Sequence, residues 1–235
     1  MKRLALLLWL VAFPAAAADC PDCPELVAIP GGTLVRDGAP PVEVAPLFMA
    51  RTEITFDQLA VCVRAGACRG GQSDHGWGRG SRPVINVTHG DAEAYAAWLS
   101  GLTGKRYRLP TEDEWEWAAR GGTSTTWWWG DTVGEGHANC RNCGTEWSGK
   151  MSAPVASLPP NPYGLHDMAG NVWEWVADCW HPDRAAAPHA RDCSQRITKG
   201  GAWYYIPSQS QPTTRARNAA GLWSYTVGFR VVREY

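Results

Sequence analysis

The chain has 235 residues and a mass of 25.7 kDa, with 22 Lys and Arg against 23 Asp and Glu and a formal net charge of -1. Nucleic-acid-binding proteins neutralise phosphates with an excess of basic residues, so this balance argues against a nucleic-acid partner. Hydrophobic residues make up 45% of the chain and charged residues only 19%, which excludes a disordered protein. These values are typical of one globular domain with its own core.

The N-terminus has the pattern of an export signal. A basic start is followed by an apolar stretch at 4–13 that is too short to span a bilayer, and then by three alanines at 16–18. We therefore expect residues 1–18 to be a signal peptide, the mature protein to begin at Asp19, and its location to be periplasmic or secreted. No membrane span is expected after signal removal. A lipoprotein anchored through Cys20 is an alternative, although aspartate is a poor residue before a lipidated cysteine.

Eight cysteines form four pairs that are close in sequence: Cys20 and Cys23, Cys62 and Cys68, Cys140 and Cys143, and Cys179 and Cys193. In an oxidising compartment such spacing predicts disulfides. We expect the second and fourth pairs to form local bridges. The two C-x-x-C units either close on themselves or cross-link each other, and a four-cysteine zinc site made from both is the alternative.

Three helices are predicted from their N-terminal capping residues. Each starts with a threonine that is followed three positions later by a residue able to complete a capping box, or a looser version of one: Thr55 and Gln58, Thr88 and Asp91, Thr111 and Glu114. Apolar residues then recur at helical spacing until a glycine is reached at Gly66, Gly104 or Gly121. The aromatic residues in these stripes are expected to be core.

Short β signals occur at 27–29, 203–206 and 227–232. From Gly122 onward regular periodicity is scarce, and clusters of glycine, asparagine and proline predict long loops. The chain is therefore expected to be a single α+β domain that is low in regular secondary structure.

Five motifs follow one another along the chain: RLPTEDEWEWAAR at 108–120, PNPYGL at 160–165, GNVWEW at 170–175, KGGAW at 199–203 and GFR at 228–230. Together they resemble the sulfatase-modifying-factor family, whose founding activity is that of the formylglycine-generating enzyme. The resemblance implies a variant of the C-type-lectin-like fold over residues 19–235. Function still has to be argued from the site, because one fold carries many functions.

The founding enzyme oxidises a cysteine of sulfatases with oxygen and a copper ion held by two cysteine thiolates. Soft thiolates suit Cu(I), so that chemistry needs sulfur a few residues after the Gly-Gly pair. When the motif is aligned from Gly200 and Gly201, the two copper positions are occupied by Tyr205 and approximately by Ser210, and the last cysteine of the chain is Cys193. Copper chemistry of this kind is therefore not expected.

The resemblance also implies a calcium site. Its ligands would be side-chain oxygens of Asp167 and Glu174 and backbone carbonyls of Gly170 and Val172, which is the hard oxygen set that calcium prefers. The alternative is that Glu174 pairs with an arginine beside core tryptophans while Asp167 caps a turn.

Two classes of function remain open. The first is a binding or accessory factor for an exported protein or small molecule, with a C-terminal loop that presents Trp203, Tyr204, Tyr205, Arg215, Arg217 and Trp223. The second is a maturation enzyme of exported substrates, an oxygen-dependent oxidoreductase that uses no cysteine. In that case Tyr205 and either His75 or His166 are the candidates for catalysis.

Overall fold

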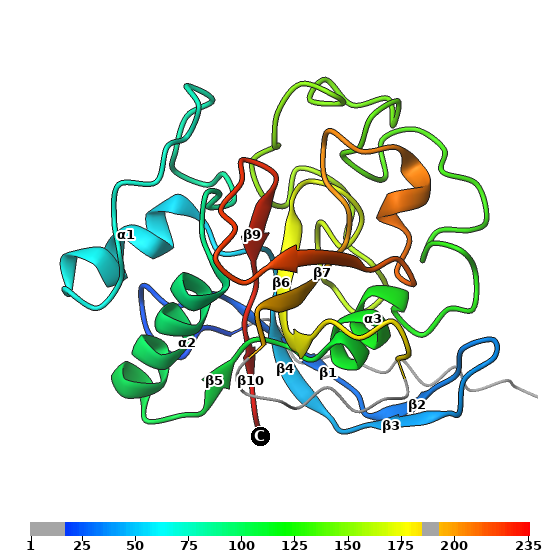
Figure 1. Ribbon diagram of the computed structural model, residues 1–235, viewed down its shortest axis with the longest axis horizontal. Coiled ribbons are helices and arrows are strands. Elements are labelled where there is room, and N and C mark those ends of the chain that lie inside the picture. The colour runs from blue at the N-terminus through cyan, green and yellow to red at the C-terminus, as the bar shows by residue number, and fades with distance from the viewer. Residues whose placement is uncertain (1–16, 185–192) are drawn as a thin grey trace, which may run out of the picture.

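The computed structural model describes residues 17–184 and 193–235 (Figure 1). The expected signal peptide falls almost wholly on residues 1–16, outside the described residues, so it stays a prediction. Within the described ranges no helix is both long enough and apolar enough to cross a bilayer.

The three capped helices are confirmed. They are α1 (Phe56–Arg64), α2 (His89–Thr103) and α3 (Glu112–Arg120). At each start the threonine hydroxyl accepts a hydrogen bond from the backbone N–H three residues on, and the side chain at that position accepts one from the threonine N–H. This satisfies two donors that a helix start leaves free. Helices α2 and α3 end at glycines with positive φ, whereas α1 ends earlier than Gly66, with Ala65 as its C-cap.

One sheet joins the two ends of the chain. Its strand order is β1-β4-β10-β5, with bounds Leu26–Ile29, Leu47–Ala50, Val232–Arg233 and Tyr107–Arg108, and all neighbours are antiparallel. A separate hairpin of β2 (Gly32–Leu34) and β3 (Val42–Val44) extends to one side of α3 (Figure 1).

The second sheet has the order β8-β7-β6-β9, with bounds Ala216–Ala219, Gln195–Lys199, Trp173–Cys179 and Val227–Phe229. Strands β6 and β9 are parallel, and the other neighbours are antiparallel. Strands β9 and β10 belong to different sheets and are separated only by Arg230 and Val231. These two residues therefore connect the sheets.

A fully buried ion pair lies at this connection. Arg230 donates from Nε to Glu174 Oε2 at 2.6 Å and from Nη2 to Glu174 Oε1 at 2.7 Å. The same guanidinium donates to the carbonyl oxygens of Ala50 at 3.1 Å and His166 at 3.0 Å. Glu174 Oε2 also accepts from Trp115 Nε1 at 2.6 Å. The structure thus shows the alternative in which Glu174 pairs with an arginine. A bidentate pair of this kind is strong and directional.

Two β expectations need correction. Residues 203–206 form no strand but a turn before the short 3₁₀-helix η1 (Pro207–Ser210). The carbonyls of Trp203 and Tyr205 accept from N–H groups of the long loop, at Gly149 and Arg141, instead of from a neighbouring strand. The expected strand at 227–232 is split at Arg230, because that side chain turns into the interior. The α+β single domain is confirmed.

All eight cysteines form disulfides: Cys20–Cys23, Cys62–Cys68, Cys140–Cys143 and Cys179–Cys193. The two C-x-x-C units therefore close on themselves. The zinc alternative is wrong, because the thiolates that it requires are all used in S–S bonds.

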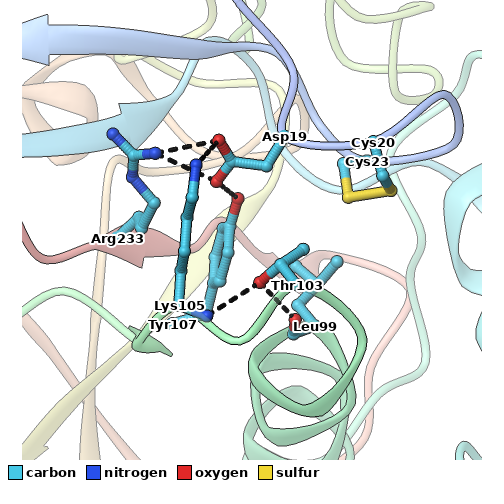
Figure 2. The surroundings of a disulfide bond; sticks show 8 residues. All are labelled: Asp19, Cys20, Cys23, Leu99, Thr103, Lys105, Tyr107 and Arg233. Carbon is cyan, nitrogen blue, oxygen red and sulfur yellow. Dashed lines mark hydrogen bonds and ion pairs between the residues drawn. A yellow bond between two sulfur atoms is a disulfide. The ribbon is translucent and has the colours of Figure 1, made fainter.

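The first residue of the expected mature chain is held tightly (Figure 2). The Asp19 carboxylate accepts from Lys105 Nζ at 2.5 Å, from the Tyr107 hydroxyl at 2.6 Å and from Arg233 Nη1 at 2.8 Å. Burial acts to raise the pKa of Asp19, but its bonds to Lys105 and Tyr107 outweigh that effect and lower the pKa. The carboxylate thus ties the N-terminal segment to β5 and β10.

We predict that Asp19→Asn lowers the free energy of unfolding by about 2 kcal/mol, because an amide cannot accept all of these bonds and leaves two cations without their counter-charge. Urea unfolding at neutral pH measures the change. The matched control is Asp22→Asn, an exposed aspartate close by. Equal stabilities of the two variants would contradict the anchoring role.

Candidate functional site

Aromatic rings from three loops gather on one face of the molecule. We call His75, Trp77, Trp203, Tyr204 and Tyr225 the aromatic cluster. Trp77 lies 5.2 Å from Trp203 and 6.4 Å from Tyr225 between ring centroids, and Trp203 lies 5.8 Å from Tyr225. His75 lies 5.3 Å from Tyr225, and Tyr204 lies 5.4 Å from Trp203. The mostly tilted and edge-on geometries are those that aromatic pairs favour.

The outer side of this cluster is open to solvent. Tyr204 is 44% exposed and Tyr225 is 41% exposed, while Trp203 at their centre is buried. Leu222 and Trp223 stand beside Tyr225 in the turn before β9, and Trp223 is 64% exposed. Ile206, which follows Tyr205, is 48% exposed. Contiguous exposed aromatic surface of this kind is typical of a binding site.

A small cavity of about 120 Å³ lies next to the cluster. Its wall combines rings with amide and hydroxyl groups: Trp173, Tyr205, Gln209, Ala216, Asn218, Leu222, Ser224, Thr226 and Val227. Tyr205 connects the cavity to the cluster, since its ring lies 5.7 Å from Trp173 and 5.9 Å from Tyr204. The cavity is large enough for a few water molecules or a small substituent of a ligand.

The resemblance places one copper cysteine at Tyr205 and the other approximately at Ser210. Only the first of these positions lies in the cavity wall. Tyr205 forms part of the cavity wall, whereas Ser210 is fully buried and its hydroxyl has no hydrogen-bond partner. Ser210 packs against Gly201, where a Cβ would lie 2.4 Å from Ser210 Oγ. The close approach of η1 to the Gly-Gly turn thus depends on the absence of a side chain at Gly201.

The predicted ligand-binding residues are only partly brought together. Trp203, Tyr204 and Tyr205 lie in or next to the cluster, and Trp223 is exposed beside it. Arg217 is exposed on β8. Arg215 points elsewhere: it pairs with Glu112 at 3.0 Å and lies over the ring of Trp180.

The two histidine candidates lie in different environments. His75 is exposed and belongs to the aromatic cluster. His166 is buried, with Nδ1 2.8 Å from the carbonyl oxygen of Leu158 and Nε2 3.2 Å from Arg51. Only His75 could therefore contact a molecule bound at the cluster.

Several residues of the cavity wall were not predicted from the sequence. Asn218, Ser224 and Thr226 reach it from β8 and from the turn before β9. Nothing in their spacing marks them, because pairing of β7 with β8 and of β6 with β9 creates their proximity.

The predicted calcium ligands lie around the buried ion pair. Asp167 Oδ2 accepts from the N–H of Ala156 at 2.8 Å, while its Oδ1 is buried and has no partner. Glu174 is occupied by Arg230 and Trp115. In the described part of the chain, no group of three or more His, Cys, Asp or Glu lies close enough together to hold a metal ion. Calcium binding stays a prediction, and any site would need backbone or water oxygens.

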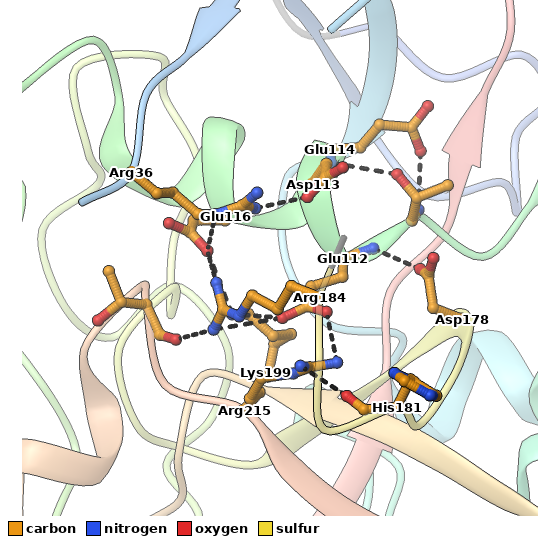
Figure 3. A network of polar contacts seen from close by, with 12 residues as sticks. Arg36, Glu112, Asp113, Glu114, Glu116, Asp178, His181, Arg184, Lys199 and Arg215 are labelled. Carbon is orange, nitrogen blue, oxygen red and sulfur yellow. Dashed lines mark hydrogen bonds and ion pairs between the residues drawn. The ribbon is translucent and has the colours of Figure 1, made fainter. Parts of the chain in front are cut away.

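A network of charged side chains joins α3 to the β2–β3 hairpin and to β7 (Figure 3). Glu116 is fully buried and pairs with Arg36 at 3.1 Å, with Arg184 at 3.1 Å and with Arg120 at 2.9 Å. The buried Lys199 lies 3.5 Å from it. Burial acts to raise the pKa of Glu116, but Lys199 and then Arg36 outweigh this and lower the pKa to about 2. A cavity of about 530 Å³ adjoins the network, with Arg36 and Arg184 in its wall.

The family model described as "Sulfatase-modifying factor enzyme 1-like domain" matches residues 12–235. The chain belongs to the sulfatase-modifying-factor family. It is 34% identical over 183 residues to the formylglycine-generating enzyme of Mycobacterium tuberculosis, across 66% of this chain and 58% of that protein. It is 36% identical over 167 residues to the inactive C-alpha-formylglycine-generating enzyme 2 of Bos taurus, across 63% of this chain and 49% of that protein. The chain thus spans about half the length of these relatives.

A solved structure, that of PvdO from Pseudomonas aeruginosa, superposes over nearly the whole molecule. The TM-score is 0.82 at 31% sequence identity, and the match covers 95% of this chain and 99% of that one. The predicted family and its fold are therefore confirmed.

We predict that Gly201→Ala lowers the free energy of unfolding by about 2–4 kcal/mol, because φ is 76° and the new Cβ would collide with Ser210 and with the Gln209 carbonyl. Chemical denaturation measures this loss. Gly221→Ala is the control, since nothing lies within 4 Å of a Cβ there. A change below about 0.5 kcal/mol in both variants would contradict the packing of η1 on the Gly-Gly turn.

We also predict an acid-sensitive stability that depends on Glu116. Its pKa is about 2 in the folded protein against a usual value of 4.5, so its stabilisation is complete above pH 4.5 and is lost as the pH falls toward 2. The linked free energy is about 3 kcal/mol. Glu116→Gln should be less stable at neutral pH and should lose less stability between pH 4.5 and 2, as measured by urea unfolding at each pH.

The control for this experiment is Glu25→Gln, whose side chain is 57% exposed. It should keep the wild-type pH profile. If the free energy of unfolding of Glu116→Gln falls with pH in parallel with that of the wild type, another carboxyl group controls the loss of stability in acid.

Proposed function

We propose that this chain is a binding or accessory factor that acts on other exported molecules and contacts them through the aromatic cluster. The observation that carries the proposal is the lack of free cysteines where the resemblance places the copper thiolates: alignment from Gly200 and Gly201 puts Tyr205 and approximately Ser210 at those positions, and every cysteine of the chain is held in a disulfide. Without two thiolates there is no soft site for Cu(I).

The cluster has the chemistry of a recognition surface. Tyrosine and tryptophan offer large contact areas and lose little side-chain entropy on binding. The turn that presents Tyr204 is fixed by buried Trp203 and by backbone hydrogen bonds to the 139–149 loop and to Asn171. The turn that presents Tyr225 is fixed on either side of that residue, where the carbonyl oxygens of Ser224 and Thr226 accept from the N–H groups of Asn86 and Trp173. A preorganised surface costs less free energy to order when a partner binds.

An exported location supports this role. Four disulfides suit an oxidising compartment, and the predicted signal peptide would deliver the chain there. We infer a periplasmic or secreted protein whose partner is another exported protein or a small molecule.

A second candidate function is a maturation enzyme of the oxidoreductase type. The observation that favours it is the cavity beside Tyr205, whose wall includes Gln209, Asn218 and Thr226. The resemblance implies that one of the family's copper cysteines would lie at Tyr205. In that case Tyr205 and His75 would face the substrate. The family resemblance over the full chain fits either function.

We predict that Trp223→Ala with Tyr225→Ala reduces capture of the partner from a periplasmic or culture-supernatant extract by at least about tenfold, because truncating hot-spot aromatics costs more than 1 kcal/mol each. Quantitative mass spectrometry of material retained on immobilised protein is the measurement. The control replaces exposed apolar residues on other faces, Val35→Ala with Leu102→Ala. Equal retention by both double variants would contradict the assignment of the surface.

The expected loss of formylglycine chemistry has a separate test. The protein, supplied with Cu(I) and oxygen, is incubated with a cysteine-containing sulfatase peptide, and aldehyde formation is followed by mass spectrometry. We expect no conversion above the peptide alone. Turnover would contradict the loss of formylglycine chemistry.

A further inference from the structure

The larger cavity lies along the edge of a strand and has no part in the proposed function. It has a volume of about 530 Å³, and four consecutive residues, 42–45, line it from the side of the β2–β3 hairpin. Successive side chains of a strand point to opposite faces, so a wall that contains all four residues is formed by the backbone edge of β3. The start of α3 supplies the facing wall, with Thr111, Glu112, Asp113 and Glu114. The cavity is therefore a groove between β3 and α3.

The edge of β3 that faces this groove is unpaired. Strand β2 covers the other edge and is the only strand neighbour of β3 in the described part of the chain. Every second residue of an antiparallel strand directs both its N–H and its C=O away from that neighbour. Outside the pairing with β2, the described residues make no hydrogen bond to the backbone of residues 42–45. Such an edge is a template to which an extended chain can add as a further strand.

The hairpin is fixed relative to α3 on both sides of β2. After β2, Arg36 pairs with Asp113 at 2.5 Å and with Glu116 at 3.1 Å (Figure 3). At the start of β2, Gly32 packs on the ring of Trp117, where a Cβ would lie 2.6 Å from the nearest ring atom. The groove is thus formed before a partner arrives, which lowers the free-energy cost of binding.

The wall of the groove contains more acidic than basic side chains: Glu43, Glu112, Asp113, Glu114 and Asp178 against Arg36 and Arg184. Both arginines are committed to the buried Glu116, at 3.1 Å each. Two of the acids have cationic partners outside the wall, Arg215 at 3.0 Å from Glu112 and Arg108 at 2.7 Å from Glu114.

Glu43 and Asp113 carry the acidic charge that is left open to a partner. Glu43 is exposed and accepts from the Thr33 hydroxyl at 2.7 Å, and it takes part in no ion pair of the described residues. The side chain of Asp113 is 38% exposed and shares Arg36 with Glu116. Basic side chains would therefore complement this groove.

We propose that the groove binds an extended, basic segment of a partner protein, which adds to β3 as a third strand of the hairpin. Main-chain N–H and C=O groups of the segment pair with the open edge of β3. Its basic side chains, at alternate positions, meet Glu43 and Asp113, and the apolar side chains between them lie beside Val42 and Val44. The groove and the aromatic cluster are built from different elements, so this inference is independent of the proposed function.

The chemistry of the groove discriminates between occupants. A second copy of this chain would bring two acidic grooves together, and like charges on adjacent strands are unfavourable. A small organic cation could neutralise Glu43 or Asp113, but it would leave the N–H and C=O groups of the strand edge unpaired. A basic strand satisfies both the charge and the edge.

The test uses the mature, disulfide-bonded protein and a fluorescently labelled peptide of sequence Lys-Val-Lys-Val-Lys with blocked ends. At about 3.3 Å per residue, residues 42–45 offer an edge of about 13 Å, which matches a strand of four or five residues. Fluorescence polarisation at low salt measures the affinity. We expect saturable binding of one peptide per chain, and binding of the acidic peptide Glu-Val-Glu-Val-Glu that is weaker by at least about tenfold.

Two N-methylated analogues of the basic peptide separate strand addition from attraction by charge alone. One is methylated at the lysine amides and the other at the valine amides. Because the N–H groups of successive strand residues point to opposite edges, only one of these two sets can face β3. We expect one analogue to lose at least about tenfold in affinity and the other to bind as the unmodified peptide does.

Protein variants locate the peptide. Glu43→Gln and Asp113→Asn should each weaken binding about threefold, because each removes one exposed ion pair. Glu135→Gln removes an exposed charge outside the groove and should keep the wild-type affinity. Changes in backbone amide NMR shifts on addition of the peptide should centre on residues 42–45.

The proposal is overturned if the two N-methylated analogues bind equally well, since recognition would then not use the strand edge. It is also overturned if the basic peptide shows no saturable binding. Loss of peptide binding in Trp223→Ala with Tyr225→Ala would place the peptide at the aromatic cluster and would overturn it as well. Wild-type peptide affinity in that double variant, whatever its effect on partner capture, would support a separate groove.

Discussion

The buried pair of Arg230 and Glu174 is the interaction on which the arrangement of this domain depends. Arg230 lies in the two-residue connection between β9 and β10, and its guanidinium reaches β6 through Glu174, β4 through the Ala50 carbonyl, and the loop before β6 through His166. Trp115 of α3 completes the contact from the other side. One side chain thus fixes both sheets and a helix relative to each other. Removing either charge would leave the other buried and unpaired, which is far more costly than the pair itself is stabilising.

A rigid centre of this kind leaves the peripheral loops free to differ in chemistry. The aromatic cluster is built from the turns that follow β7 and precede β9 and from the loop between α1 and α2, so the scaffold determines its position but not its residue types. This separates fold from function: the sulfatase-modifying-factor scaffold is retained, while no cysteine follows Cys193, in the part of the chain where the resemblance places the copper thiolates. The ionic network at Glu116 ties the β2–β3 hairpin to β7 through α3. The low pKa of Glu116 predicts that this network stabilises the folded chain.

The sequence predicted the parts that depend on local chemistry. The capping threonines Thr55, Thr88 and Thr111 define helix starts because their hydrogen bonds close within three residues. Strand pairing is not local: β10 joins β4 and β5 across most of the chain, and β6 pairs with β9 in parallel. For the same reason the walls of the Tyr205 cavity could not be foreseen. The turn at 203–206 has β-favouring residues, but tertiary hydrogen bonds to the 139–149 loop override that preference.

The central claim is that this member of the family has no thiolate copper site, and a copper(I) titration tests it most directly. The mature protein, prepared without reductant, competes with a chromophoric copper(I) chelator while free thiols are counted by alkylation after unfolding. We predict no labelled cysteine and no withdrawal of copper(I) from the chelator, because all eight cysteines are paired and residues 194–235 contain no cysteine. Stoichiometric copper(I) bound at sub-nanomolar affinity, with two cysteines open to alkylation, would contradict the account and return the protein to oxygen-dependent chemistry.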